Sequence, residues 1–233
     1  METEIGGIPL TIEKKKIKNI YLKVLSPNGK VVISAPKRMS LKAIEEFVIS
    51  KQDWILDKRK RYENQPIQEA LQYETGEKIM FFGREYSLEV QEYGGCKKIA
   101  LAEDKIQMYI KEGCTREQRE QYLNEWYRKQ LKLRIPALIE KWEPVMKVQV
   151  KEWNVKNMKT RWGTCNIKAH RIWLNLQLAK STPECLEYVV VHEMTHLLER
   201  NHNQRFYEYM DLFLPEWRER KDRLNGVKTE KEF

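Results

Sequence analysis

The amino-acid sequence predicts an α+β protein: a β-rich N-terminal region with one helix, then a C-terminal domain with a small antiparallel sheet beside one apolar helix. Three observations lead to this prediction. Short stretches of alternating apolar and polar residues, separated by glycine and charged turn residues, recur over residues 8–35 and 77–110. A helical pattern follows each of these two regions, over residues 41–63 and 115–145 respectively. The last strand-like stretch leads directly into the apolar helical segment 184–200, which begins after Pro183.

The change from strands to a long helical pattern sets the predicted domain boundary. Residues 1–113 are expected to form the N-terminal region, with an accessory role or a role in binding a substrate or partner. Residues 114–233 are expected to form the domain that carries the chemistry. A chain of 233 residues is long enough for two such domains with buried cores.

The first region is expected to fold as a small antiparallel meander and a basic helix. Its strand-like stretches are residues 8–13, 17–25 and 30–36. The sequence Ser-Pro-Asn-Gly at residues 26–29 is typical of a turn. Ser40 is a suitable N-cap for the helix over residues 41–63, and the cations at residues 58–61 complement the dipole at the end of that helix.

The middle of the chain is expected to hold a connection, a second set of strands and a long helix. Residues 64–76 have the composition of a connection, and the strands lie within residues 77–110. In the helix over residues 115–145, Pro136 predicts a kink and Pro144 predicts the end. The aromatic stripe of this helix is expected to pack in the core rather than to bind a ligand. It consists of Tyr122, Trp126 and Tyr127.

The composition is that of an ordinary globular protein. Charged residues make up 33% and hydrophobic residues 41% of the sequence, and no apolar run is long enough to span a bilayer. The N-terminal sequence METEIGGIPLTIEKKK has early acidic residues and lacks the apolar core of a secretory signal. We therefore expect a soluble, cytoplasmic protein with no membrane partner. The four cysteines form no CxxC pair, which argues against a disulfide framework and a cysteine-based zinc site.

Positive charge is concentrated at the front of the chain. The formal net charge is +9, and residues 1–64 hold 14 Lys and Arg against 8 Asp and Glu. Such an excess suits a nucleic acid or another polyanion as a partner of the basic N-terminal region. A solvated surface that keeps the protein in solution is the simpler interpretation, because charge balance serves solubility as much as binding.

The segment VVHEMTHLL at residues 190–198 has the pattern of a catalytic metal site. His192 and His196 are four residues apart, so a helix brings both imidazoles to one face, one turn apart. Glu193 projects beside this pair and can reach a water molecule on the metal without being a ligand, which is the position of a general base. Three of the four histidines lie within eleven positions, so a chance group of surface histidines is the weaker interpretation.

His202 is expected to be the third ligand, because a catalytic zinc site takes three protein ligands and leaves one position open. It lies six residues beyond His196, past the expected helix end, so the chain must turn back sharply. Asn201 can adopt the left-handed backbone conformation that such a turn needs. The fourth histidine, His170, is expected in a solvated hairpin. The competing third ligands are Glu199, Glu208 and Asp211.

Six stretches of the chain resemble sequences of one known protein family. They are MKTRWGTCN, IWLNLQL, LEYVVVHEMTHLLERNHNQRF, LPEW, PKRMSLKAIEEFVISKQDWI and GREYSLEV. In these stretches the chain resembles the YgjP-like branch of the SprT-like zinc metallopeptidases, and the resemblance covers the whole chain. It implies zinc on His192, His196 and His202, with Glu193 catalytic. We therefore expect one zinc ion per chain as cofactor and a zincin-like metallopeptidase fold for residues 114–233.

The expected function is that of a zinc-dependent metalloendopeptidase, which uses a Glu-activated water to cleave a peptide or protein substrate. The candidate substrate-binding residues are Arg161, Trp162, Gly163, Arg205 and Tyr207. The first three lie on a strand that can order an extended substrate by β-addition. The last two follow the third ligand, where a group that stabilises the oxyanion is needed. Cys165 is expected to be a buried, inert thiol.

Two other functions stay open at the level of the sequence. One is a non-catalytic, zinc-stabilised module that binds nucleic acid or protein. Glu193 argues against it, because a structural zinc site has four protein ligands and no base. The other is metal-assisted hydrolysis of a non-peptide substrate, which no feature of the sequence excludes.

Overall fold

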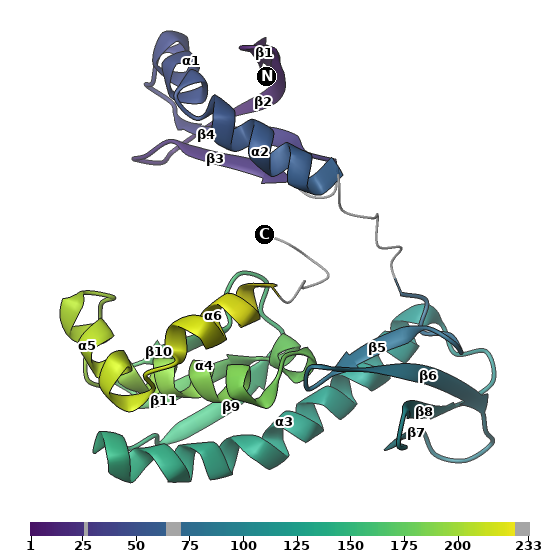
Figure 1. Ribbon diagram of the computed structural model, residues 1–233. Helices are drawn as coiled ribbons and strands as arrows, with labels where there is room; N and C mark the ends of the chain where they lie inside the picture. Colours follow the sequence, from purple (N-terminus) through teal and green to yellow (C-terminus); the bar gives the residue numbers. More distant parts are fainter. Residues whose placement is uncertain (26–27, 64–70, 227–233) are drawn as a thin grey trace. The chain divides into compact units, whose positions relative to one another are not determined.

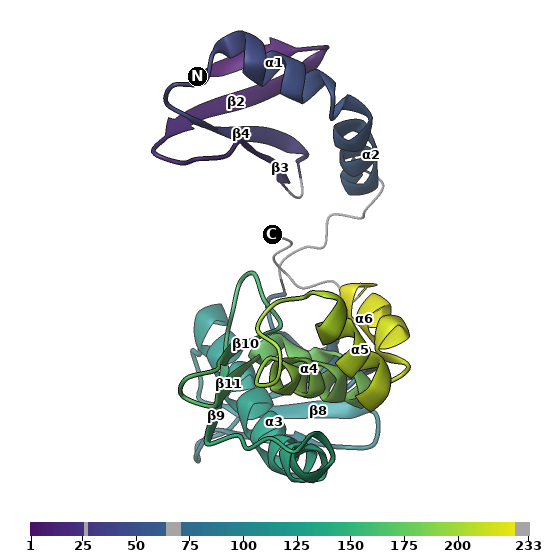
Figure 2. The same cartoon turned by 90° about the vertical axis from the view of Figure 1, so that its left-hand side faces the viewer.

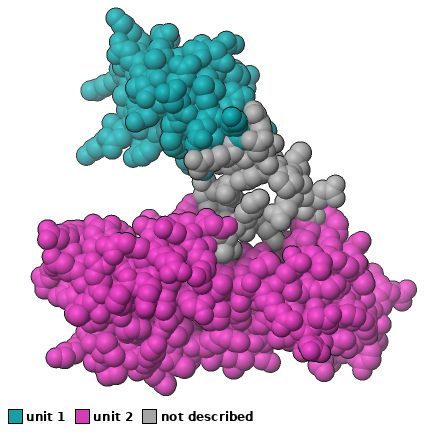
Figure 3. Space-filling model, in the orientation of Figure 1, with its two compact units in different colours: residues 1–70, 230–233 teal, residues 71–229 magenta. Residues whose placement is uncertain are grey.

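The computed structural model describes the chain over residues 1–25, 28–63 and 71–226. Ser26 and Pro27 of the expected first turn and residues 64–70 of the expected connection lie outside these residues. Two compact units, drawn in two colours in Figure 3, divide the chain into residues 1–70 with 230–233 and residues 71–229.

This division falls earlier than the expected boundary between residues 113 and 114. The strands between residues 78 and 110 belong to the second unit, because their apolar side chains share one buried core with the C-terminal helices. A backbone hydrogen bond adds to this packing: the N–H of Phe82 donates to the carbonyl of Ala179 at 2.8 Å. The sheet that sequence patterns assign to the N-terminal region is thus a part of the unit that carries the histidines.

The N-terminal unit is a four-stranded sheet with two helices (Figure 1). Its elements in chain order are β1 (Glu2–Ile5), β2 (Ile8–Lys15), β3 (Tyr21–Leu25), β4 (Lys30–Pro36), α1 (Leu41–Ile49) and α2 (Gln52–Glu63). The strand order is β1-β2-β4-β3, with β2 and β4 parallel and the outer pairs antiparallel. The expected antiparallel meander is therefore wrong. β3 folds back along the outer edge of β4, which leaves β4 to pair with β2.

The single helix expected over residues 41–63 is divided into α1 and α2. Ser40 caps α1 as predicted, because its Oγ accepts the N–H of Ala43 at 3.2 Å. The division comes after Ser50, whose hydroxyl donates to the carbonyl of Phe47 at 2.7 Å. A serine that bonds back to the preceding turn competes with the helical backbone and weakens it. The N-terminal region therefore has two helices where one was predicted.

The second unit begins with a sheet of the same topology as the first. Its strands are β5 (Lys78–Phe81), β6 (Arg84–Glu92), β7 (Lys98–Leu101) and β8 (Lys105–Ile110), in the order β5-β6-β8-β7. The central pair, β6 and β8, is again parallel, and the outer pairs are again antiparallel. In both units a helix with a hydroxyl N-cap follows the last strand. The chain thus uses one β-topology twice.

The long helix α3 (Arg116–Met146) forms one side of the core of this unit. Thr115, expected as the first residue of the helix, is its N-cap and forms a capping box with Gln118. The aromatic stripe packs in the core as expected: Trp126 and Tyr127 are buried, with Tyr122 against them. Pro136 and Pro144 both lie inside α3, so Pro144 does not end it, and the helix stops at Lys147, whose φ of 53° is left-handed. Of the helices that the structure describes, none, α3 included, is both long and apolar enough to cross a membrane.

A three-stranded sheet lies beside the helix that carries the histidines. Its strands are β9 (Glu152–Lys156), β10 (Gly163–Asn166) and β11 (Arg171–Asn175), in the order β10-β11-β9. β10 and β11 are antiparallel, whereas β11 and β9 are parallel. The small antiparallel sheet expected here is therefore a mixed sheet, because the chain passes from β9 to the far edge before it returns through β11. As a result β10 is an edge strand.

Helix α4 (Pro183–Thr195) is the central element of this part of the unit. The 3-10 helix η1 (Leu176–Lys180) precedes it, and α5 (Gln204–Phe213) and α6 (Trp217–Gly226) follow it. Figure 2 shows α4 between the β9–β11 sheet and the helices α5 and α6. Most side chains of α4 are buried, which explains why its sequence is almost continuously apolar. Pro183 is the first residue of α4, one residue before the expected start of the helix.

Glu187 ties α4 to two neighbouring helices. Its carboxylate accepts hydrogen bonds from Lys141 Nζ at 2.6 Å and Trp142 Nε1 at 3.1 Å, both on α3. It also accepts one from Arg220 of α6 at 2.7 Å. Burial alone raises the pKa of Glu187, but these hydrogen bonds outweigh burial and hold that pKa below its usual value. The ionised carboxylate therefore fixes α4 in place one turn before the first histidine.

Candidate metal centre

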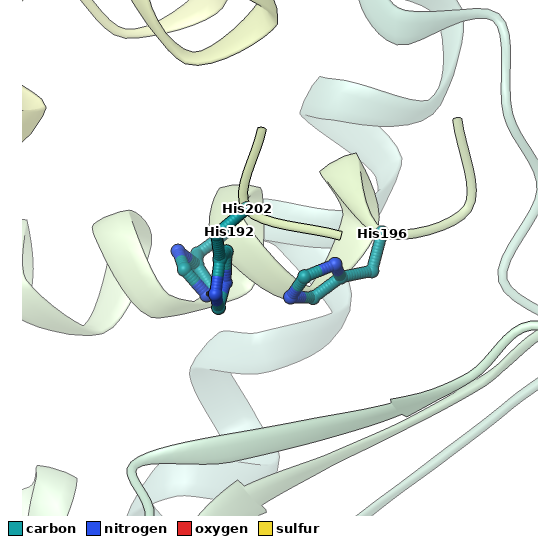
Figure 4. A group of neighbouring side chains, drawn as sticks. All are labelled: His192, His196 and His202. Carbon is teal, nitrogen blue, oxygen red and sulfur yellow. The ribbon is translucent and has the colours of Figure 1, made fainter. Parts of the chain in front are cut away.

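Three histidine side chains converge at the end of α4. His192 lies in the last turn of α4, His196 is its C-cap residue, and His202 follows before α5 begins. One ligand nitrogen of each ring lies within 4.8 Å of the other two, and Figure 4 shows the rings facing a common point. The spacing of four residues places the first two on one face of the helix, as predicted. Within the described part of the chain, no other three His, Cys, Asp or Glu side chains form such a group.

A tight turn after α4 brings His202 back to the helix. The helix ends at Thr195, before its expected end, and the carbonyl of Thr195 accepts the N–H groups of Leu198 at 2.9 Å and Glu199 at 3.0 Å. The left-handed conformation expected at Asn201 is wrong, because its φ is not among the positive values of the described residues. The N–H of Asn201 instead donates to the Glu199 carboxylate at 3.2 Å. A side-chain bond thus shapes the turn without a strained backbone.

The imidazole nitrogens are spaced as ligands of one metal ion. His192 Nε2 and His202 Nε2 lie 3.1 Å apart. Two nitrogens that each lie about 2.0–2.1 Å from a tetrahedral zinc ion are themselves about 3.3 Å apart. His196 approaches the carbonyl of Glu199 with Nδ1 at 3.1 Å, which orients its ring and leaves Nε2 for a metal. The nitrogens of His192 and His202 are therefore already at the spacing of metal ligands, and the nitrogen of His196 lies within 4.8 Å of both.

Phe206, which sequence reasoning missed, packs against all three imidazoles. Its ring centroid lies 5.0 Å from that of His192, 4.8 Å from that of His196 and 4.7 Å from that of His202. It is 1% exposed and occupies the inward face of α5 together with Met210. The only signal in the sequence is its place four residues after His202, at the start of the next helical pattern. Its rigid ring restricts the positions that the imidazoles can take.

The surroundings keep the three imidazoles neutral. Burial lowers the pKa of His192 to about 3, and the neighbouring His196 and His202 add to this shift. Burial also lowers the pKa of His196 and that of His202 below the usual value. Neutral imidazole is the form that binds metal ions, so protons compete little for these nitrogens at neutral pH.

Glu193 is buried beside the histidine group and pressed against β10. It is 5% exposed. Burial raises the pKa of its carboxyl group to about 8, and the charge of Arg161 opposes this shift. A Cβ atom at Gly163 would approach Glu193 Oε1 to 2.5 Å. Only glycine leaves room for the carboxylate at this point of the strand, so β10 and α4 together determine where the carboxylate lies.

The histidines and Glu193 line an open cleft of about 1030 Å³. Residues 161–168 form one wall of the cleft, and the predicted Arg161, Trp162 and Gly163 are among them. Arg161 and Trp162 precede β10 and do not lie on the strand, as was expected, because the strand begins at Gly163. Cys165 on this wall is half-buried, and burial, with the charge of Glu193, raises the pKa of its thiol to about 12. The thiol therefore stays protonated at neutral pH, although its side chain is half-buried and not buried as expected. Tyr188, one turn before His192 on α4, also lines the cleft and was missed by sequence reasoning.

The two other predicted substrate-binding residues, Arg205 and Tyr207, do not line the cleft. Arg205 donates to the hydroxyl of Tyr209 at 3.1 Å. The ring of Tyr207 stacks on Trp217 with 5.6 Å between centroids. Both lie outside the cleft because Phe206 takes the inward face of α5. Their closeness to His202 in the sequence therefore does not bring them to the metal centre.

The competing third ligands bond elsewhere. The Glu199 carboxylate accepts a hydrogen bond from the N–H of Asn201. Gln204 donates to the Glu208 carboxylate, and Trp217 donates to the Asp211 carboxylate. His170 lies in the turn between β10 and β11, as predicted, with a left-handed φ of 49°. Its Nδ1 lies 3.0 Å from the carbonyl of Gln149. Of the four histidines, His170 alone is not part of the group.

Asn175, a buried residue that sequence reasoning missed, holds the loop between β9 and β10. Its Nδ2 donates to the carbonyls of Met158 at 2.9 Å and Arg161 at 2.7 Å. Its Oδ1 accepts the N–H groups of Met158 at 3.3 Å and Gln177 at 3.1 Å. This loop leads into the cleft wall at Gly163. Asn175 is therefore a positioning residue for the wall that faces Glu193.

Replacing Asn175 with alanine is expected to lower the free energy of unfolding by about 1–3 kcal/mol, because buried backbone groups lose their partners. It is also expected to lower peptide cleavage more than the lost stability explains, since Arg161 and Gly163 lose their anchor. Thermal denaturation and cleavage rates of the folded fraction check both effects. Asn154→Ala is the control, because Asn154 Oδ1 accepts the N–H of the adjacent Val155. Equal effects of the two substitutions on cleavage would refute the positioning role.

Three neutral imidazoles at the end of a helix, a buried carboxylate beside them and an open cleft are groups that metal-dependent hydrolases use. The family model of the YgjP-like metallopeptidase domain matches residues 18–226, so this chain belongs to the YgjP-like metallopeptidase family. A metal-dependent peptidase is the class that this membership supports. No curated protein sequence matches the chain.

Among solved structures, the metallopeptidase zymogen abylysin of Pyrococcus abyssi is similar to part of the chain. The two are 21% identical, with a TM-score of 0.36. The match covers 39% of this chain and 90% of that chain.

Proposed function

We propose that this protein is a zinc-dependent metalloendopeptidase with a zincin-like fold, in which His192, His196 and His202 hold the metal and Glu193 is the general base. The position of Glu193 carries the proposal. It is buried on α4 next to His192, and it touches Gly163 at the wall of an open cleft. A site that serves only to stabilise a fold has four protein ligands and no such carboxylate.

Zinc suits this set of donors. Three neutral imidazoles are ligands that zinc prefers, and three protein ligands leave a coordination position free for chemistry. When bound, zinc supplies a Lewis acid that makes water acidic enough to lose a proton near neutral pH.

Glu193 accepts this proton and later passes it to the leaving amine. A base serves best when its pKa lies near the working pH, because it must both take up and return a proton. Burial raises the pKa of Glu193 to about 8. The charge of Arg161 already limits this rise. A cation held by the histidines would lower the pKa of Glu193 further, towards neutral pH, because positive charge favours the ionised carboxylate.

The substrate is a peptide that binds as an added strand along β10. In the described part of the chain β10 pairs with β11 alone, and residues of β10 line the cleft. Unpaired backbone groups of an edge strand bind an extended chain. Because Gly163 touches Glu193, a peptide along this edge passes directly over the carboxylate.

Removing the metal tests the proposal. The zinc-loaded protein is expected to cut internal bonds in a mixed peptide library, and a chelator is expected to abolish cleavage until zinc is added back. Mass spectrometry of the products identifies the bonds and distinguishes endopeptidase from exopeptidase cleavage. Full activity after complete metal removal would contradict the zinc chemistry. A zinc-loaded protein that cuts no member of the library would contradict the peptidase function.

A further inference from the structure

Three cations border the proposed peptide cleft. Arg161, Lys168 and Arg200 line it, and all three side chains are exposed. Among the residues that the structure describes, none of them has an ion-pair partner. The acidic side chain that lines the cleft is Glu193, which is buried. Positive charge on the walls of this cleft is therefore not balanced by acidic side chains on the same walls.

This excess is a local separation of charge rather than a property of the whole region. Residues 161–233 hold 12 Lys and Arg against 11 Asp and Glu, which is close to neutral. Many cations outside the cleft are paired: Arg171 with Glu152 at 3.2 Å and Arg220 with Glu187 at 2.7 Å are examples. On an ordinary solvated surface, positive and negative side chains lie side by side. Such a surface does not account for three cations without ion-pair partners on one cleft.

The three cations are spread along the path of an extended chain. Arg161 stands just before β10, close enough to Glu193 for its charge to act on that carboxyl group. Lys168 stands beyond the other end of β10, and Arg200 follows the turn after His196. The four residues of β10 alone span about 13 Å, so Arg161 and Lys168 are separated by several substrate residues.

We propose that this cleft selects acidic peptides, with Asp or Glu side chains within a few residues of the bond that is cut. The inference rests on the proposed peptidase function and names its substrate class. A peptide fits better than another polyanion because the cleft wall is an edge strand, whose backbone groups pair with a peptide backbone. The side chains then meet the cations at the rim, where charge governs both specificity and association rate.

Three series of fluorogenic peptides, alike except for Glu, Gln or Lys at the positions that flank a fixed central pair, test the proposal. The zinc-loaded protein is expected to cleave the Glu series with a kcat/KM about fivefold above the Gln series for each well-placed charge, and the Lys series more slowly still. The differences are expected to shrink in 0.5 M salt, because screening acts on exposed charges. Equal kcat/KM for the three series would overturn the selectivity and leave the peptidase function standing.

Charge reversal assigns the selectivity to the cleft. The double variant Lys168→Glu/Arg200→Glu is expected to lose or invert the preference for the Glu series. Its matched control is Lys129→Glu/Lys132→Glu, because both lysines are exposed on α3 and neither lines the cleft. The control is expected to keep the preference. An unchanged preference in the cleft variant, or an equal loss in the control, would overturn the proposal.

A binding measurement keeps the proposal testable if no series is cleaved. The zinc-loaded Glu193→Gln protein is expected to bind the Glu peptides more tightly than the Lys peptides, whether or not turnover is found. Equal affinity would overturn the inference on its own. A competition experiment gives a second test, in which unlabelled Glu peptide or a single-stranded oligonucleotide of the same charge displaces a labelled Glu peptide. Displacement by the oligonucleotide at the lower concentration would also overturn the inference, because the cleft would then recognise a nucleic acid.

Discussion

Replacing Glu193 with glutamine is expected to lower kcat for peptide cleavage by about 10²- to 10⁴-fold while the protein keeps its metal. Glutamine has nearly the shape of glutamate and can fill the same buried space against Gly163, but it cannot accept and return a proton. The histidines are untouched, so metal content should match that of the wild type. Steady-state cleavage and metal analysis on the same preparation check both statements.

Glu184→Gln is a matched control for this experiment. Glu184 lies in the first turn of α4, it is exposed, and it does not line the cleft. The same chemical change on the same helix is therefore expected to leave cleavage close to that of the wild type. If Glu193→Gln cleaved peptides as fast as this control, Glu193 would not be the base.

Replacing Gly163 with alanine is expected to lower kcat about 100-fold without loss of metal, because a misplacement of about 1 Å at a catalytic group has effects of this size. The new Cβ would come within 2.5 Å of Glu193 Oε1 and 2.8 Å of Glu193 Cδ. Atoms cannot stay this close, so either the carboxylate or β10 must move. The histidines lie on α4 and in the turn after it and are expected to keep their places. Cleavage rates and metal content are the measurements.

Gly94→Ala shows whether any added methyl group has the same effect. A Cβ at Gly94 would have no atom within 4 Å, and the φ of Gly94 is not positive. This control is expected to keep full activity. If Gly163→Ala cleaved peptides as fast as the wild type, the contact between β10 and Glu193 would not be needed for catalysis. If the Gly163→Ala protein lost its metal, β10 would support the histidines as well.

The core of the site can be predicted from the sequence because helical geometry is local. A spacing of four residues brings His192 and His196 together on one face, and Glu193 follows directly. The place of His202 follows from the requirement for a third ligand, but the route of the chain does not. The turn uses a bond from the N–H of Asn201 to the Glu199 carboxylate, and no sequence pattern distinguishes it from a left-handed turn.

Residues that act across the fold are the ones that the sequence does not reveal. Gly163 is a candidate from the sequence, but its contact with Glu193 from a strand is not predicted. Asn175, which holds a loop 14–17 residues away, is not predicted at all. Phe206 supports the imidazoles from α5. In contrast, Arg205 and Tyr207 are close to His202 in the sequence but lie outside the cleft. Phe206 and Met210 occupy the inward face of α5, so the residues on either side of Phe206 point elsewhere. Distance along the chain was the wrong guide in these cases.

The strand topology also depends on contacts that no local pattern encodes. Alternating apolar residues predict strands well, and most of the expected strands exist. They do not tell which neighbours pair, and all three sheets contain one parallel pair that the expected meander lacks: β2 with β4, β6 with β8 and β9 with β11. The domain boundary was misplaced for the same reason, since the shared core that joins the strands at residues 78–110 to the later helices forms only on folding.

The zinc content of the wild type and of His202→Ala, measured side by side after dialysis against metal-free buffer, tests the central claim most directly. The wild type is expected to retain one zinc ion per chain, and His202→Ala is expected to lose it, because two ligands from one helix hold the ion far less tightly than three. His170→Ala, at the histidine outside the group, is expected to behave as the wild type. Full zinc retention by His202→Ala, or a wild type that binds no zinc, would contradict the three-histidine centre.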